Sequence, residues 1–88
     1  MEQMLEMLKI DLGITTTAYD SRLTKYLESA QTEITREGVS LNMDTVGDVS
    51  LVVMYAAWLW RRRDTGEGMP RMIRYALNNR VLSQKMGG

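Results

Sequence analysis

Ten consecutive apolar residues, from Leu51 to Trp60, run directly into three arginines. We predict a helix over residues 45–63, which would be about 28 Å long at ~1.5 Å per residue. The apolar run is about half of the ~20 residues that a membrane-spanning helix needs. A soluble helix that is apolar on every side is normally buried on every side. Either the rest of this short chain or a partner must therefore cover it.

The predicted helix has two nearly opposite apolar faces, because residues two positions apart on a helix differ by about 200°. One face carries Val49, Val52, Val53, Ala56 and Trp60. The other carries Leu51, Met54, Tyr55 and Trp58. We expect the first face to pack inside the protomer and the second to contact a neighbouring subunit. In that case truncation of Trp60 impairs folding and truncation of Trp58 impairs assembly. Alternatively, the first and last helices of the same chain cover the second face.

Composition excludes most enzyme chemistries. The 88 residues predict a single domain over residues 1–88 and contain no cysteine and no histidine. Disulfides, zinc sites of the usual Cys/His kind and Ser-His catalysis are therefore ruled out. The carboxylates form no close pair in an apolar setting, and Gly66 and Gly68 do not form a phosphate-binding loop. We expect no enzymatic activity, no catalytic residue, and no metal or cofactor.

Charge is divided unevenly along a chain whose formal net charge is zero. Residues 1–44 contain eight acidic and four basic side chains, whereas residues 45–88 contain three acidic and seven basic ones. Two oppositely charged halves can attract further copies of the same chain head to tail. Alternatively, the helices simply distribute their solvated charges unevenly.

The second predicted helix, within residues 14–38, has the clearest amphipathic pattern. Its apolar face comprises Tyr19, Leu23, Tyr26, Leu27, Ala30 and Ile34. Thr17 and Asp20 have the spacing of a capping box. Gly38 is the residue expected just after the helix end.

Two further helices complete the prediction. A short one over residues 2–12 is ended by Gly13, and the last begins at Pro70, a favoured first-turn residue, and ends near Leu82. Its apolar side chains are Ile73, Ala76, Leu77 and Val81. We expect the tail, SQKMGG, to fray or to be ordered by a partner. The fold class is therefore all-α, a small bundle of about four helices, one short and three longer.

Basic residues form two candidate surfaces. Arg61, Arg62 and Arg63 either complement the helix dipole or contact phosphate. Arg71 and Arg74 share a face of the last helix and are candidates for a subunit contact. Together these residues could also form a small nucleic-acid-binding module. Overall neutrality and a pI near 6.2 argue against autonomous DNA binding.

Three segments occur in order: DLGITTTAYDSRLTKYLESAQTEITREG, then YAAWLWRRR, then MPRMIRYALNNRVLSQK. Over residues 9–85 the chain resembles the small head–tail connector (adaptor) proteins of tailed bacteriophages and prophages. The resemblance implies an all-α structural protein of the virion, made in the bacterial host cytoplasm, with no catalytic activity. It also implies a ring, expected to be twelve-fold, that docks under the portal protein and extends the channel through which packaged DNA passes. The next connector, stopper or tail component would bind below, and no membrane partner is expected.

A ring of identical subunits needs two different contact patches on each chain. We expect the acidic second helix of one protomer to meet the basic third or fourth helix of its neighbour. Charge reversal at Arg71 and Arg74 should then weaken assembly. Arg61, Arg62 and Arg63 are the candidates for facing the DNA channel or phosphate.

Overall fold

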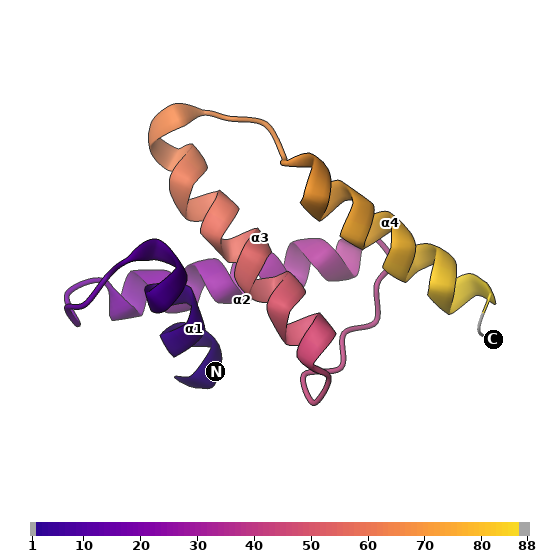
Figure 1. Ribbon diagram of the computed structural model, residues 1–88, viewed down its shortest axis with the longest axis horizontal. Coiled ribbons are helices and arrows are strands. Elements are labelled where there is room, and N and C mark those ends of the chain that lie inside the picture. Colours follow the sequence, from indigo (N-terminus) through magenta and orange to yellow (C-terminus); the bar gives the residue numbers. More distant parts are fainter. Residues whose placement is uncertain (1, 87–88) are drawn as a thin grey trace.

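A computed structural model describes residues 2–86. It contains four helices: α1 (Glu2–Leu12), α2 (Asp20–Arg36), α3 (Val46–Thr65) and α4 (Arg71–Met86). No strand occurs among the described residues, and the helices follow one another as Figure 1 shows. The predicted all-α bundle of one short and three longer helices is confirmed.

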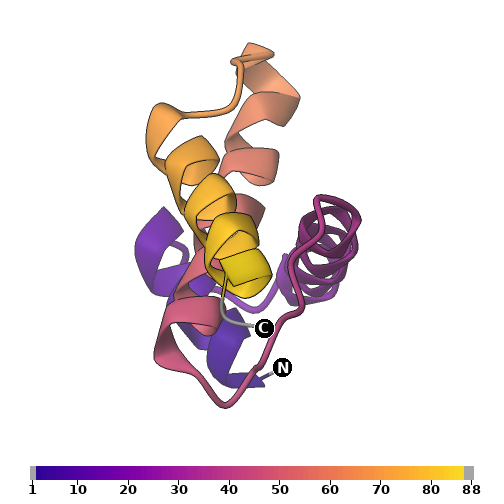
Figure 2. The same cartoon turned by 90° about the vertical axis from the view of Figure 1, so that its right-hand side faces the viewer.

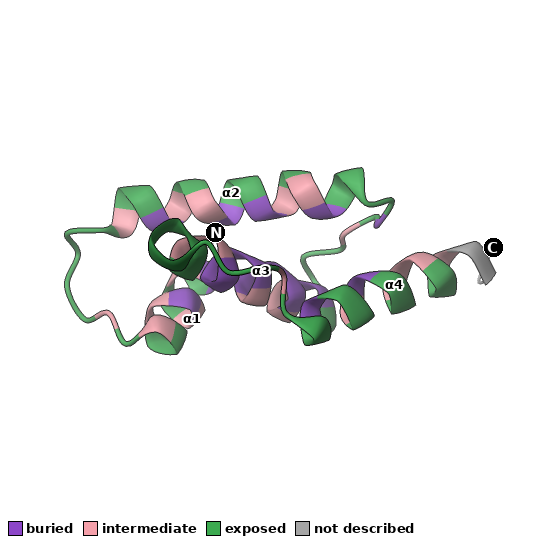
Figure 3. Cartoon of the chain, turned by 90° about the horizontal axis from the view of Figure 1, so that it is seen from above, coloured by how far each residue is buried: buried purple, intermediate pink, exposed green. Residues whose placement is uncertain are grey.

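The helices form two layers. Helix α2 lies along one side, and α1, α3 and α4 make up the other, as the end-on view of α2 in Figure 2 and the view from above in Figure 3 show. The molecule measures 43 × 29 × 17 Å, so it is a thin slab. Its accessible surface is 5808 Å², compared with about 5,300 Å² expected for a compact monomer of this mass. The protomer thus exposes more surface than its size requires.

The core forms where α3 packs against α2 and α1. The predicted inner face of α2 is buried at Leu23, Leu27, Ala30 and Ile34. Figure 3 shows that the buried stretches of α2 lie on the side of the helix that is turned toward α3. The 3.6-residue spacing of the apolar residues was therefore sufficient to predict which side of α2 is buried.

Two predicted helix ends are confirmed, and one predicted cap is wrong. Gly13 and Gly38 follow α1 and α2 with φ of 72° and 100°, a backbone conformation that favours glycine. The capping box at Thr17 does not form, since α2 begins only at Asp20 and has no side-chain cap. The carboxylate of Asp20 instead binds the Lys9 ammonium of α1 at 2.8 Å. An ion pair between helices has taken the place of the local cap.

Helix α4 extends past the predicted end at Leu82, through Ser83, to Met86. Gln84 explains the extension, because its side chain makes two hydrogen bonds to the backbone of Ser40. The Ser40 N–H donates to Gln84 Oε1 at 3.0 Å, and Gln84 Nε2 donates to the Ser40 carbonyl at 2.9 Å. The expected fraying is thus wrong for the part of the tail up to Gln84, whereas residues 87–88 lie outside the described structure.

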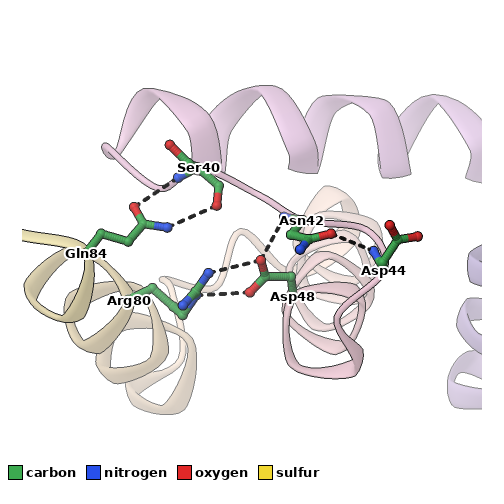
Figure 4. A network of polar contacts seen from close by, with 6 residues as sticks. All are labelled: Ser40, Asn42, Asp44, Asp48, Arg80 and Gln84. Carbon is green, nitrogen blue, oxygen red and sulfur yellow. Dashed lines mark hydrogen bonds and ion pairs between the residues drawn. The ribbon is translucent and has the colours of Figure 1, made fainter. Parts of the chain in front are cut away.

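A buried carboxylate joins α4 to α3 (Figure 4). Asp48, in the first turn of α3, is only 1% exposed. Its Oδ2 accepts the Asn42 N–H at 2.8 Å and a guanidinium N–H of Arg80 at 3.0 Å, while Oδ1 lies 2.9 Å from Arg80 Nε. This network fixes both the loop before α3 and the position of α4.

Candidate subunit interface

The α3 face predicted to contact a neighbouring subunit is mostly buried within the protomer. Leu51, Tyr55 and Trp58 belong to the core, and Met54 is partly buried. The prediction that this face is left open for a neighbour is therefore wrong for Leu51, Tyr55 and Trp58. The reason is that α1 and α4 pack against α3, which was the alternative considered from the sequence. The connection between α3 and α4, which that alternative did not include, also packs over Trp58.

Trp58 is the better buried of the two tryptophans, with 6% of its surface exposed. Its Nε1–H lies 3.1 Å from the carbonyl of Gly68 and 3.4 Å from that of Glu67. Its ring meets the Tyr55 ring edge to face at 5.3 Å between centroids. The α3–α4 connection thus folds back onto Trp58, and its carbonyl groups accept the indole N–H, which is the only hydrogen-bond donor of that side chain.

Trp60 lies at the edge of the core and is only partly buried. Its ring meets Tyr19 and Tyr26 edge to face, at 5.6 Å and 5.7 Å between centroids. The guanidinium of Arg63 stacks over the same ring at 3.7 Å. The prediction that Trp60 is the buried tryptophan and Trp58 the outer one is therefore reversed. Trp58 lies inside the protomer and Trp60 lies at its edge.

The three arginines at the end of α3 are exposed, and each makes a contact within the chain. Arg61 lies 3.5 Å from the Asp11 carboxylate, and Arg63 lies 3.2 Å from that of Asp64. The Arg62 guanidinium lies over the Trp58 ring, 5.0 Å from its centroid. Successive helical residues point about 100° apart, so the three side chains do not form one flat patch. Their DNA-facing role stays a prediction.

The two α4 arginines that were predicted to contact a neighbouring subunit differ in their environment. Arg74 binds the Glu37 carboxylate at the end of α2 at 3.2 Å. Arg71 is exposed and forms no ion pair with any residue in the described range. Part of the attraction expected between an acidic α2 and a basic α4 therefore acts within one protomer. Of these two arginines, only Arg71 has no ion-pair partner among the described residues and so keeps its charge available to a neighbour.

A shallow groove of about 220 Å³ brings some of the predicted interface residues together. Met54 and Trp58 line it on the α3 side, and Pro70, Met72 and Ile73 line it from the start of α4. Leu51 and Tyr55 do not line it. The groove thus lies between α3 and the turn of α4 that carries Arg71. Of the predicted interface residues, only Met54 and Trp58 line it.

Sequence reasoning missed the buried pair of Asp48 and Arg80. Asp48 could be read only as an acidic residue near a helix N-terminus, and Arg80 only as one more cation of the last helix. They lie 32 positions apart, which no helical period connects. Gln84 was missed for the same reason.

Burial raises the pKa of the Tyr55 phenol above its ordinary value, and the carboxylates of Glu33 and Glu37 raise it further. The folded protein therefore holds this proton more tightly than the unfolded chain does. Tyr55 contributes stability that is complete below the ordinary tyrosine pKa of about 10 and is lost as the pH rises through the folded-state value.

We expect the unfolding free energy to fall above about pH 10, and to fall less steeply in Tyr55→Phe. Urea titrations at a series of alkaline pH values measure this difference. Tyr75→Phe, at an exposed position of α4, is the matched control and should keep the parent slope. Equal slopes for Tyr55→Phe and the parent would contradict the assignment.

Within residues 2–86, no three Asp or Glu side chains lie close enough to hold a metal ion. None of the described helices is long and apolar enough to cross a membrane.

Comparison with known proteins gives one match. A family described as "Phage gp6-like head-tail connector protein" matches residues 2–79, which is most of the chain. No curated protein and no solved structure matches this chain.

Proposed function

This chain belongs to the phage gp6-like head–tail connector family, and on that premise we propose that its copies close into a ring beneath the portal of the filled head. The family is one of structural connectors rather than enzymes. In the proposed assembly the ring extends the DNA channel and offers its other side to the next connector or tail component. A twelve-fold ring is the expectation from the resemblance noted above.

The family match over residues 2–79 is the observation that carries this proposal. The shape of the protomer agrees with it. A slab 17 Å thick with excess surface has broad faces that further copies can cover. A heterologous contact between two different edges of such a slab generates a closed ring when the rotation from one copy to the next closes.

Arg61, Arg62 and Arg63 remain our candidates for the channel wall. All three are exposed at one end of α3, so a ring that turns this end inward would present them to DNA. Asp11 and Asp64 partly neutralise them. A channel wall of moderated charge suits passage of DNA, since strong binding to phosphate would retard it.

Electron microscopy of the purified protein, alone and mixed with the portal protein of the same phage, tests the proposed function. We expect a closed ring docked coaxially on the portal. Absence of both rings and portal binding would contradict the proposal. Tight DNA binding by the isolated chain that falls steeply with salt would instead indicate the nucleic-acid-binding alternative.

A further inference from the structure

The outer face of α4 carries large exposed apolar side chains and one positive charge, with the exposed Asn79 among them. Met72 and Tyr75 are 73% and 62% exposed, and Leu82 lies on the same side of the helix two turns further on. Arg71 shares this side, and α4 contains no acidic residue. Ile73 and Leu77 occupy the opposite, buried side. Nothing in the protomer covers the outer face, although large side chains occupy it.

A second apolar surface lies between α1 and the start of α3. In Figure 1 these two segments lie below and to the left of α4, toward the other side of the slab. It is a groove of about 310 Å³ lined by Gln3, Met7, Met43, Asp44, Val46 and Val49. Val46 is 79% exposed. Asp44 lines this groove, and Glu6 lies one helical turn from Gln3 on α1. Both carboxylates are exposed and form no ion pair with a described residue.

The acidic residues of α2 are mostly neutralised by cations of the same protomer. Asp20 binds Lys9, Glu33 binds Arg36, and Glu37 binds Arg74. Among the α2 carboxylates Glu28 is exposed and has no ion pair with a described residue, whereas the α1 edge brings two unpaired carboxylates, Glu6 and Asp44, next to an apolar groove. The α1 edge is therefore the better partner for a face that carries both Arg71 and apolar side chains.

We propose that the outer face of α4 of one copy packs into the α1–α3 groove of the next, with Arg71 beside Glu6 and Asp44 of that copy. The occupant is a second copy of this chain, because the two surfaces are both apolar, carry opposite unpaired charges and lie on different sides of one slab. A contact of this kind is heterologous, so each copy uses both surfaces and the chain of contacts continues around a ring. The inference rests on the proposed ring and specifies which faces form it.

Disulfide cross-linking tests the contact directly, since the chain has no native cysteine. Val46→Cys and Tyr75→Cys are made as separate single variants and mixed, so that a disulfide between them joins two different copies. Rings are assembled with or without the portal protein and then oxidised. We expect a covalent dimer in the mixture and little in either variant alone. The matched control replaces Val46→Cys by Ser29→Cys, on the exposed side of α2, and should give little cross-link.

The outcomes separate the inference from the proposed function. Rings that show no Val46→Cys to Tyr75→Cys link, or that link through Ser29→Cys, overturn the inference and leave the ring standing. A strong dimer from Tyr75→Cys alone also overturns it, because it would indicate an α4-to-α4 contact. If no ring forms under any condition and the portal protein is not bound, the proposed function and the inference both fall.

Charge exchange provides a second test. Arg71→Glu should weaken assembly about threefold to tenfold per contact, because it places like charges together. Adding Asp44→Lys and Glu6→Lys to Arg71→Glu should restore assembly, as measured by analytical ultracentrifugation or by ring counts on the portal. Arg22→Glu, an exposed change on α2, should leave assembly unchanged. Assembly of Arg71→Glu equal to that of Arg22→Glu would overturn the inference.

Discussion

Trp58→Ala is expected to lower the unfolding free energy by about 3–5 kcal/mol, the range for deletion of a buried aromatic side chain. The indole is almost fully buried, meets Tyr55 edge to face, and donates its N–H to the α3–α4 connection. Its loss leaves a cavity and also frees the segment that leads into α4. Urea unfolding followed by far-ultraviolet circular dichroism measures the effect.

Two companion variants separate the contributions to this loss. Trp60→Ala should cost less, about 1–3 kcal/mol, because Trp60 is partly exposed and loses mainly its two edge contacts with tyrosines. Trp58→Phe keeps most of the ring but lacks the donor, and should cost about 1 kcal/mol for the lost hydrogen bond in addition to a small packing loss. A larger effect of Trp60→Ala than of Trp58→Ala would contradict the burial described above.

Arg80→Met is expected to lower the unfolding free energy by about 2–4 kcal/mol. The change removes the cation from a carboxylate that is 1% exposed, and an unpaired buried charge is strongly destabilising. Removal of one partner of a fully buried pair costs about 3–5 kcal/mol. The Arg80 side chain is 35% exposed, so water screens part of the interaction and the expected loss is smaller than that. The measurement is again urea unfolding.

The double variant Asp48→Asn/Arg80→Met should recover part of this loss. The asparagine carries no charge, yet its Oδ1 can still accept the Asn42 N–H that Asp48 binds. Arg22→Met, at an exposed site on α2, should stay within about 0.5 kcal/mol of the parent. An effect of Arg80→Met no larger than this control would show that the Asp48 pair contributes little to stability.

The sequence was most informative where local periodicity decides the structure. Leu23, Leu27 and Ile34 recur at helical spacing, and they are buried as that spacing predicts. Gly13 and Gly38 mark helix ends because their positive φ favours glycine. These features depend only on neighbours along the chain.

The candidate interface was predicted less well because helix α3 is apolar on all sides. Its periodicity could not tell which face a distant segment would cover, and residues 66–70 fold back over Trp58 rather than Trp60. The carboxylate of Asp48 likewise finds its cation 32 residues away. Both outcomes depend on tertiary packing, which leaves no local pattern in the sequence.

The way α4 is attached has a consequence for how the molecule fluctuates. Among the α4 side chains that the structure describes, Ile73 and Leu77 are buried and Ala76 and Val81 are partly buried against the core. Polar contacts through Arg74, Arg80 and Gln84 make up the rest of the attachment. Partial opening reactions begin where few apolar contacts must be given up. We therefore expect α4 to detach at a lower cost than global unfolding, with the contacts among α1, α2 and α3 retained. Amide hydrogen exchange would then show α4 exchanging through an opening of lower free energy than that of α2 and α3.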